Sequence, residues 1–511
     1  MLRTPSLPAW RASNRFATVC ISVCIFLITL SSGIAVAADT LRVGSKRFTE
    51  SYVLGEILTQ TAGPLGKAEH RQGLGNTAIV FEALKSGSID VYAEYLGTID
   101  LEILKHATPR SITDINRELA PLGLGVAIPL GFNNTYALAV RDADVAHSSI
   151  RTLSDLAAQA ALQVGLSHEF LGRRDGWPGL AQRYGLQQRP LGLDHGIAYE
   201  ALAAKKVDVI DIYSTDAKID KLGLRVLKDD LQYFPRYDAV LLYRLDMVQR
   251  FPQAWRAMQG LEGKISERRM IAMNAAVELD GQTFAHVASA FLSSENAGTQ
   301  RRTGLLGKLF DDNLWRLTRQ HMLLVAVSVG LAILVGVPLG MVAATVPRLN
   351  QTVMATVGVL QTIPSLALLA MLIPLLGTIG TLPALVALFM YALLPVVRNT
   401  CTGLQQVPDG LRMAARALGM EAKDRMLHIE LPLALPVILA GVKTAAVMSV
   451  GTATIAAFIG AGGYGERIAV GLAINDNDML LAGALPSAAL ALATQLLFER
   501  IEGAARRGRP A

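Results

Sequence analysis

The chain contains little cysteine and little charge for its length. Of its 511 residues only 3 are cysteine and 18% are charged, whereas 51% are hydrophobic. Cys20 and Cys24 lie in an N-terminal apolar segment and Cys401 follows the third of the later apolar spans, so the middle of the chain can form no disulfide. This scarcity excludes a disulfide-rich secreted domain, and the excess of apolar residues indicates a membrane part.

Several kinds of functional site are also missing from the sequence. The net charge of +6 is not gathered into a basic stripe with interleaved aromatic residues, which argues against nucleic-acid binding. No Gly-x-x-x-x-Gly-Lys-Ser/Thr phosphate loop occurs, so ATP must be hydrolysed by another polypeptide. Asp194 and His195 are neighbours, but no serine or cysteine nucleophile signature lies near them. We expect no catalytic site, no metal site and no cofactor in this chain.

The first 38 residues have the pattern of an export signal. Arg3, Arg11 and Arg15 precede an uncharged stretch from Phe16 to Ala38, which contains the small-residue cleavage pattern Ala35-Val36-Ala37. The stretch is long for a signal peptide, so an uncleaved N-terminal anchor is the alternative. Both interpretations place residue 41 onward outside the cytoplasm.

Uncharged blocks long enough to cross a bilayer follow residue 321. They are Met322 to Val346, Thr352 to Val397, Thr444 to Gly465 and Met479 to Phe498. The second block is long enough for two helices, and the turn-forming segment Leu376 to Pro383 interrupts it. We therefore predict an all-α membrane domain of five spans at residues 322–498.

The basic residues orient these spans. If the soluble part is outside, five crossings leave the basic tail 499–511 and the basic loop 398–432 in the cytoplasm, as the positive-inside rule requires. The basic residues within 297–321 disagree, but long exported domains cross a membrane largely regardless of charge. Apolar residues at helical spacing between Leu305 and Leu317 predict an amphipathic helix on the membrane surface, within a linker at 297–321.

The loop at 398–432 carries a spaced motif. Met413-Ala414-Ala415 is followed after three residues by Gly419 and after nine more by Ile429-Glu430-Leu431-Pro432. The spacing resembles the coupling loop of bacterial ABC-importer permeases, in which two short helices dock on the ATPase. The family usually has glutamate where this chain has Met413. The resemblance implies an ATPase contact formed by Ala414, Ala415, Gly419, Ile429, Leu431 and Pro432.

Residues 41–296 alternate short β-like runs with helical patterns, which predicts an α/β domain. Two segments within it have similar residues at the same spacing: Phe81 to Tyr95 and Tyr199 to Tyr213. We interpret each as a helix, a turn and a buried strand that places one tyrosine at its C-terminal end, where ligands of open α/β sheets bind. The alternative is that both tyrosines only complete the core of their lobes.

Ordered motifs in this region resemble the binding proteins for glycine betaine, choline and carnitine. They are Val43 to Lys46 with Phe48 to Glu50, Glu94 to Thr98, Asn133 to Tyr136, Arg173 to Gly176, Tyr213 to Asp216 and Phe234 to Asp238. The resemblance implies a bilobed periplasmic-binding-protein fold, type II-like, whose ligand cleft lies between the lobes. Gly336 to Gly340 and Ala461 to Gly465 also resemble the glycine betaine permease subfamily.

Carried over by position, the resemblance implies two kinds of ligand contact. Quaternary ammonium groups have no hydrogen to donate and bind to aromatic faces, whereas a carboxylate needs charged donors. Arg174 is adjacent to Arg173, and a shift of one residue would exchange them. The implied aromatic cage is Tyr95, Tyr136, Tyr213 and Tyr237, and the implied carboxylate ligands are Lys46, Thr98 and Arg173.

We therefore expect a binding domain fused to the permease of an ABC importer in the bacterial inner membrane, with the binding domain on the outer face. By resemblance it pairs with a second permease copy and two ATPase subunits and takes a quaternary ammonium compound. The alternatives are an importer for another small organic ion or amino acid, a ligand-gated sensor or channel, and a membrane-anchored enzyme. The sequence does not rank glycine betaine, proline betaine, carnitine and choline.

Overall fold

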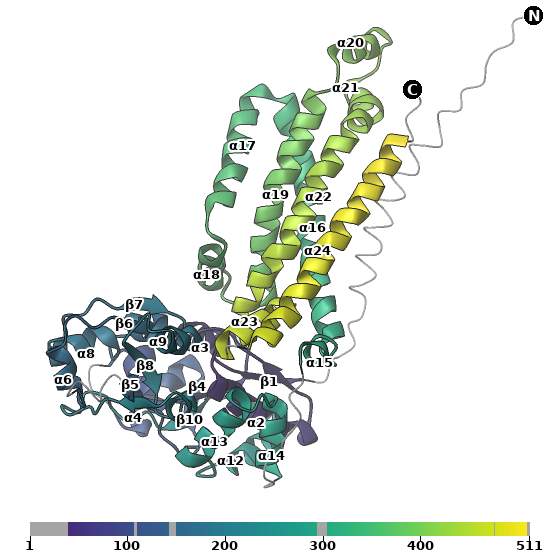
Figure 1. Ribbon diagram of the computed structural model, residues 1–511. Helices are drawn as coiled ribbons and strands as arrows, with labels where there is room; N and C mark the ends of the chain where they lie inside the picture. Colours follow the sequence, from purple (N-terminus) through teal and green to yellow (C-terminus); the bar gives the residue numbers. More distant parts are fainter. Residues whose placement is uncertain (1–38, 107–109, 143–149, 294–303, 475, 508–511) are drawn as a thin grey trace, which may run out of the picture.

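The computed structural model describes residues 39–106, 110–142, 150–293, 304–474 and 476–507, so the expected export signal lies outside the described residues. An α/β part and a helical bundle lie end to end (Figure 1). The α/β part contains two five-stranded sheets, each of which forms one lobe. The predicted fold class, a bilobed α/β domain followed by an all-α membrane domain, is confirmed.

The first lobe is built on the sheet β2-β1-β3-β10-β4. Strands β1, β2 and β3 are parallel, and β10 runs antiparallel to its neighbours β3 and β4. Its strands are β1 (Leu41–Gly44), β2 (Ala68–Arg71), β3 (Val91–Tyr95), β4 (Leu124–Ala127) and β10 (Ala239–Arg244). Its helices are α2 (Thr49–Ala62), η1 (Gly63–Leu65), α3 (Thr77–Lys85), η2 (Thr98–Ile103), α4 (Ile112–Leu119), η3 (Ala120–Leu122), α11 (Met247–Arg250), α12 (Pro252–Gln259), α13 (Glu267–Glu278) and α14 (Phe284–Leu292).

The second lobe repeats this plan with the sheet β7-β6-β8-β5-β9. Strands β6, β7 and β8 are parallel, and β5 runs antiparallel to β8 and β9. Its strands are β5 (Tyr136–Arg141), β6 (Val164–Ser167), β7 (Leu191–Leu193), β8 (Val209–Tyr213) and β9 (Leu224–Val226). Its helices are α6 (Leu153–Ala157), α7 (His168–Gly172), α8 (Trp177–Tyr184), α9 (His195–Ala203) and α10 (Lys218–Lys221).

The two similar sequence segments, Phe81 to Tyr95 and Tyr199 to Tyr213, form equivalent parts of the two lobes. Helix α3 leads to β3, which ends at Tyr95, and helix α9 leads to β8, which ends at Tyr213. Both helices begin with an Asx cap, because the side chains of Asn76 and Asp194 accept hydrogen bonds from the free N–H groups of the first turn. Each lobe therefore presents a tyrosine at the same strand end.

Two segments connect the lobes. One runs from β4 to β5 and the other from β9 to β10, and an antiparallel bridge between Asn133 and Asp238 pairs them. The N–H of Asn134 also donates to the carbonyl of Tyr237 at 3.0 Å. Backbone pairing thus joins the two segments that connect the lobes.

In the chain, the helical bundle follows α14, the last helix of the first lobe. Among the described residues, four helices are long and apolar enough to cross a membrane, at Leu314–Thr345, Thr381–Gln405, Ala422–Ile459 and Asn477–Gly503. The bundle comprises α15 (Leu305–Leu309), α16 (Leu314–Thr345), α17 (Pro347–Thr362), α18 (Ser365–Leu376), α19 (Thr381–Gln405), α20 (Asp409–Ala417), α21 (Ala422–Arg425), η4 (Met426–Glu430), α22 (Leu431–Ala456), η5 (Ala457–Ile459), α23 (Gly465–Ile474) and α24 (Asn477–Arg507).

The predicted second span is not a straight helix. Helices α17 and α18 are bent by 98° at the break between them, and they make a fifth crossing only if the bent pair counts as one. Pro364 lies at the break, and Ile363 before it has the extended backbone that a following proline favours. The turn predicted at residues 376–383 is present, because α18 ends at Leu376 and α19 begins at Thr381.

The predicted boundaries of the span at Thr444 to Gly465 were wrong. The helix that crosses there is α22, which ends at Ala456 and contains Lys443 within its length. The ammonium of Lys443 lies 3.0 Å from the carboxylate of Glu502 on α24, so the charge is paired inside the bundle. The rule that a span contains no charge therefore placed the start of this helix too far along the chain.

The predicted amphipathic helix at residues 305–317 is two helices. Helix α15 ends at Leu309, and Leu314 already belongs to the long helix α16. Between them the carboxylate of Asp311 accepts the N–H of Asn313 at 3.0 Å and pairs with Arg467. A local side-chain turn of this kind competes with the helix and stops it.

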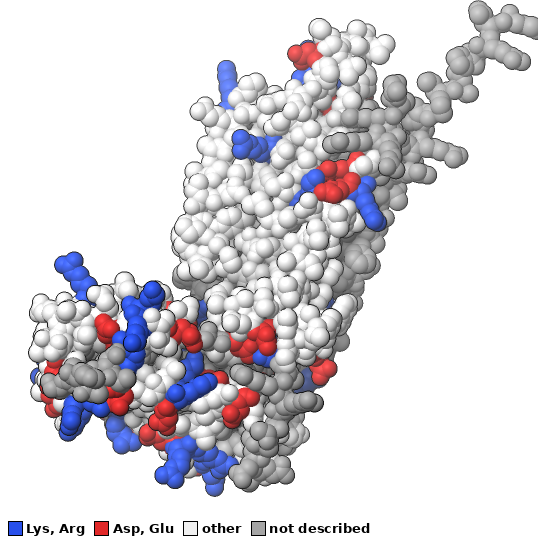
Figure 2. Space-filling view, viewed as in Figure 1, with Lys and Arg blue, Asp and Glu red and all other residues white. Residues whose placement is uncertain are grey.

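Charge is distributed unevenly over the molecule. Acidic and basic side chains are dense on the α/β part and sparse over the middle of the helical bundle (Figure 2). The α/β part lies against the end of the bundle formed by α15 and α23, whereas α20 and α21 lie at the other end (Figure 1). An apolar belt separates the two ends, as a membrane requires.

Candidate functional site

Two strand ends of the second lobe and one of the segments that connect the lobes bring three of the four predicted cage tyrosines together. Tyr136 is the first residue of β5 and the register partner of Tyr213, the last residue of β8. Their ring centroids are 5.1 Å apart. Tyr237, in the crossing segment before β10, meets Tyr136 edge-on at 5.9 Å. All three tyrosines therefore line one place between the lobes.

Three phenylalanines that the sequence analysis did not assign join this group. The ring of Phe170 lies 4.9 Å and that of Phe234 6.4 Å from Tyr136, and Phe48 lies 5.4 Å from Tyr213. Phe48 and Phe234 belong to motifs that carried the family resemblance, so they could have been found. Phe170 follows β6 on α7, and no signal in the single sequence marks it.

Tyr95 has a different environment from the other cage candidates. Its hydroxyl donates to the carboxylate of Glu50 at 2.5 Å, and the ammonium of Lys46 lies 5.0 Å from its ring centroid. Its ring is therefore already in contact with a cation of the protein.

The predicted carboxylate ligands lie at the same interlobe site, but the two cations among them are paired. The guanidinium of Arg173 donates to Asp175, with 2.8 Å between Nε and Oδ1, and its Nη1 lies 3.3 Å from Thr98 Oγ1. Lys46 Nζ donates to Glu94 at 2.6 Å. Arg173 is buried and Arg174 is exposed, so Arg173 is the arginine that faces the site.

A third acid lies between these cations. Thr77 donates to Glu169 at 2.7 Å, and Arg173 Nη1 lies 3.6 Å from Glu169 Oε1. Burial opposes ionisation of Glu169, but the charges of Lys46 and Arg173 outweigh it and lower the pKa of Glu169. With Glu94 and Asp175, the acidic side chains around these two cations outnumber them, which favours a cationic ligand.

Glu50 lies in the interior beside the aromatic group. Its carboxylate accepts four hydrogen bonds, from Tyr95, Asn134, Thr215 and Asn274, at 2.5, 2.9, 2.5 and 3.2 Å. Burial raises the pKa of Glu50, and these donors oppose that rise. Because Glu50 and Thr215 belong to different lobes, this carboxylate links the lobes directly.

Other polar contacts also cross the cleft. The hydroxyl of Thr77 reaches Glu169, Arg173 reaches Thr98, and Tyr237 donates to Asp175 at 2.7 Å. These contacts join α3 and η2 of the first lobe to the segment 169–175 of the second. The lobes are therefore closed upon each other around the aromatic group.

A buried ion pair supports Tyr213 from behind. The imidazole of His195 lies 4.5 Å from the Tyr213 ring, and its Nε2 is 3.0 Å from a carboxylate oxygen of Asp216, which also accepts from Tyr199 at 2.6 Å. Burial disfavours the imidazolium, but the charge and hydrogen bond of Asp216 raise the pKa of His195 to about 9. His195 is thus a cation that positions an aromatic wall.

The predicted coupling loop forms two short helices at the end of the bundle remote from the binding lobes (Figure 1). Gly419 follows α20 with a φ of 78°, in the left-handed region that glycine adopts without strain. Ala415 is buried, whereas Leu411, Met413, Leu418 and Leu427 are exposed apolar side chains. An exposed apolar surface of this kind is typical of a protein interface.

Pro432 lies in the first turn of α22, which continues directly from η4 (Met426–Glu430). Proline is tolerated there because the N–H groups of a first helical turn have no partner within the helix. Ile429 lies within η4, and Leu431 is the first residue of α22. Glu430 is buried and its carboxylate lies 2.7 Å from Arg425 and 3.5 Å from Arg412, which fixes the loop to the bundle.

Two protein families match the two parts of the chain. Residues 39–294 match the substrate-binding domain of ABC-type glycine betaine transport systems, and residues 336–507 match the inner-membrane component of binding-protein-dependent transport systems. The chain belongs to the ABC-type glycine betaine transport family. It is a fused binding and membrane-spanning subunit of an ABC importer, not an enzyme, and in such systems the ATPase is a separate subunit.

Relatives match each part separately. The chain is 47% identical to an osmoprotectant import permease protein of Salmonella typhimurium over 36% of this chain and 88% of that protein. It is 33% identical to a glycine-betaine-binding protein of Pseudomonas aeruginosa over 53% of this chain and 93% of that protein. It is 32% identical to an ergothioneine transport permease/ergothioneine binding protein of Helicobacter pylori over 50% of this chain, and the match spans about half (48%) of that relative.

Proposed function

We propose that the chain imports small quaternary ammonium compounds. The observation that carries the proposal is the group of aromatic rings around Tyr136, enclosed between two closed lobes and accompanied by more acidic than basic side chains. A trimethylammonium group has no proton to donate and is attracted to ring faces, by roughly 2 kcal/mol per contact when desolvated. The names of two relatives, a glycine-betaine-binding protein and an osmoprotectant permease, support this substrate class.

The carboxylate end of a betaine has candidate partners beside the rings. Arg173 and Thr98 come from different lobes and meet at 3.3 Å, and Lys46 lies on the first lobe. Because both cations are paired with acids of the protein, a ligand carboxylate must compete with Glu94 and Asp175 for them. The site therefore favours the cationic end of a ligand over its anionic end.

The two ends of the molecule support an assignment of membrane faces. The binding lobes contact one end of the bundle, and the exposed apolar side chains of α20 and the loop after it lie at the other. We propose that the lobes lie on the outer face of the bacterial inner membrane and that the coupling loop contacts the ATPase in the cytoplasm. A second copy of this chain would complete the permease.

A reporter fusion tests this orientation. A reporter that is active only in the cytoplasm should work when it is fused after Ala511 and should fail when it is fused after residue 296. The reverse pattern would contradict the proposed direction of transport.

A titration panel tests the substrate class. The full-length chain, purified in detergent, is titrated calorimetrically with glycine betaine, choline, carnitine, proline betaine and ergothioneine. Dimethylglycine is the matched control ligand, because it keeps the carboxylate and lacks the third methyl group. We expect the quaternary compounds to bind more tightly than dimethylglycine, and Tyr213→Ala to weaken their binding about thirtyfold. Failure of every quaternary compound to bind, or binding of dimethylglycine as tightly as glycine betaine, would overturn the proposal.

A further inference from the structure

The side chains of three consecutive residues after β1 point to two different parts of the molecule, the ligand site and the helical bundle. The ammonium of Lys46 lies 5.0 Å from the Tyr95 ring centroid, and the Phe48 ring lies 5.4 Å from Tyr213, so both contact the ligand site. Arg47 between them reaches the helical bundle instead. Its guanidinium lies 4.6 Å from the ring centroid of Phe458, in the 3-10 helix η5 that follows α22.

A neighbouring loop of the same lobe strengthens this contact. The N–H of Leu74 donates to the carbonyl of Ser45 at 3.0 Å, and the N–H of Arg47 donates to the carbonyl of Gly75 at 3.3 Å. The side chain of Leu74 lies against Gly460, where an added β-carbon would be only 2.4 Å from Leu74 Cδ2. Backbone hydrogen bonds therefore join the two loops, and Leu74 packs closely against Gly460.

The contacted segment of the bundle is joined to two membrane-spanning helices. Gly460 directly precedes the glycine-rich stretch Ala461 to Gly465, and the N–H of Gly463 donates to Gln320 on α16 at 3.1 Å. The Tyr464 hydroxyl donates to Thr318 at 2.9 Å, and its ring lies 4.8 Å from that of His321. His321 in turn lies 3.0 Å from the Val450 carbonyl on α22. A displacement of the stretch thus reaches α16 and α22.

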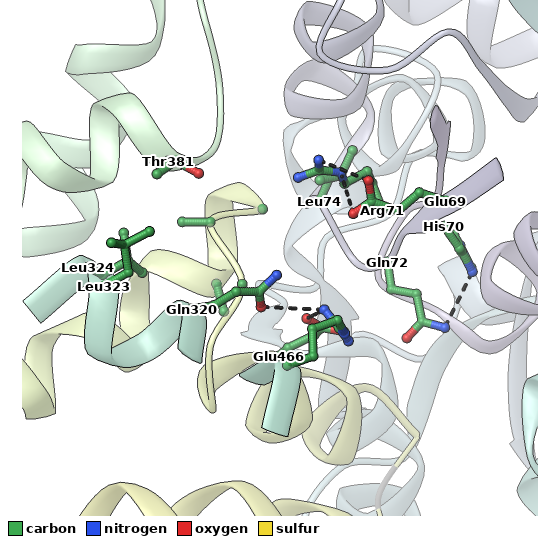
Figure 3. A pocket seen from close by; sticks show the side chains of 15 residues that line it. Glu69, His70, Arg71, Gln72, Leu74, Gln320, Leu323, Leu324, Thr381 and Glu466 are labelled. Atoms are coloured by element: carbon green, nitrogen blue, oxygen red, sulfur yellow. Dashed lines mark hydrogen bonds and ion pairs between the residues drawn. The ribbon is translucent and has the colours of Figure 1, made fainter. Parts of the chain in front are cut away.

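Space next to this contact permits such a displacement. A cavity of about 80 Å³ separates β2 from α16 and α23, with Glu69, Arg71 and Gln72 on one side and Arg316, Gln320 and Glu466 on the other. Figure 3 shows Glu69, Arg71 and Gln72 on the side of the binding lobe and Gln320 and Glu466 on the side of the bundle. Arg316 is paired with Glu466 at 2.9 Å. Polar side chains around a small cavity can shift without the cost of opening a packed core.

We propose that the segment Ser45–Phe48 transmits occupancy of the ligand site to the membrane helices of the same chain, through Arg47 on Phe458 and Leu74 on Gly460. This inference rests on the proposed function. Adjustment of Lys46 and Phe48 around a ligand shifts Arg47, because the three residues share one short backbone segment that is hydrogen-bonded to residues 74–75. The first lobe is thereby the part of the binding domain that signals to its own permease.

Comparison of ligand binding with uptake tests this transmission. Arg47→Ala and Phe458→Ala should bind glycine betaine within about twofold of the wild type, because neither side chain lines the site, and should lose uptake about tenfold. Arg47→Lys should keep most uptake, since lysine retains the cation–π contact. The double variant should be no worse than either single one. Arg117→Ala, an exposed arginine on α4, is the matched control and should behave as the wild type.

Two results of this comparison would contradict the proposal. Wild-type uptake by Arg47→Ala would show that the contact transmits nothing. Parallel loss of binding and uptake would place Arg47 in the ligand site itself. Failure of the unmodified chain to bind any quaternary compound would instead overturn the proposed function, and it is measured separately in the same titration.

Discussion

The guanidinium of Arg173 lies 5.3 Å from the ring centroid of Tyr136, while its Nε and Nη2 are held by the carboxylate of Asp175. One side chain thus contacts the central ring of the proposed cage and the proposed carboxylate site. It supplies a cation–π contact to Tyr136 and neutralises Asp175. Replacing Arg173 therefore changes both halves of the site, in opposite directions for a cation and for a carboxylate.

We expect Arg173→Ala to separate glycine betaine from choline. Glycine betaine should lose a charge-assisted hydrogen bond worth about 1.5 to 3 kcal/mol, which is a loss of roughly ten- to hundredfold in affinity. Choline has no carboxylate, and the unpaired Asp175 adds a negative charge near its ammonium, so its affinity should be unchanged or higher. Parallel calorimetric titrations of both ligands in one buffer measure the difference. Equal losses would reject the carboxylate role of Arg173.

Glu50 should control closure of the lobes rather than the choice of ligand. Four donors converge on its carboxylate, and the amide of Glu50→Gln has only one acceptor oxygen and brings two donors of its own. Unsatisfied buried donors cost about 1 to 3 kcal/mol each, so we expect all ligands to bind at least tenfold more weakly. Glu262→Gln, at an exposed glutamate, is the control. A loss restricted to one ligand would place Glu50 in the ligand contact.

His195 makes the stability of the binding lobes depend on pH. Its pKa in the folded chain is about 9, above its ordinary value of 6.5, because of Asp216 and, more weakly, Asp211 and Glu278. The imidazolium therefore stabilises the fold fully below pH 6.5, and this contribution, at most about 3 kcal/mol, is lost as the pH rises to 9.

Thermal unfolding of the full-length chain at several pH values tests the role of His195. The apparent melting temperature should fall between pH 6.5 and 9, and the fall should be smaller in His195→Gln. The same variant should also bind glycine betaine more weakly at pH 6.5, because no ring held by Asp216 then packs behind Tyr213. An unchanged pH dependence in His195→Gln would show that the ion pair contributes nothing.

The sequence predicted those features of the site that follow from local periodicity. The repeated spacing that ends at Tyr95 and Tyr213 implied two equivalent strands, and both tyrosines do end strands of equivalent lobes. The sequence could not show that Asp175 pairs with Arg173 or that Glu94 pairs with Lys46. The Lys46–Glu94 pair depends on how β1 and β3 lie in one sheet, and the Arg173–Asp175 pair on the local chain path after α7, and a single sequence specifies neither.

The membrane part shows the same limit. The uncharged runs located the spans but misplaced the start of α22. This helix contains Lys443, whose charge is neutralised by Glu502 from the last helix. The basic residues before the first span, which the positive-inside rule disfavours, have a similar explanation. Lys308 pairs with Asp476, and Arg316 pairs with Glu466. A single sequence lists charges, but their partners come from the packing of the helices.

Gly419 gives a test of the coupling loop that separates backbone conformation from bulk. Its φ is 78°, and no atom lies within 4 Å of the position of an added β-carbon, so a side chain there meets no clash and only the left-handed backbone resists it. Asparagine tolerates this conformation, whereas β-branched residues do not. We expect Gly419→Val and Gly419→Glu to abolish uptake and Gly419→Asn to retain it.

Ligand binding and co-purification of the ATPase identify the cause of that loss. Glycine betaine should bind to all three variants as to the wild type, because the lobes lie at the opposite end of the bundle. The ATPase should co-purify with Gly419→Asn and not with Gly419→Val, since the valine displaces the turn that places the exposed Leu418 and Met413. If Gly419→Val keeps both uptake and the bound ATPase, the surface at 411–427 is not the docking site, and the exposed apolar side chains there require another partner.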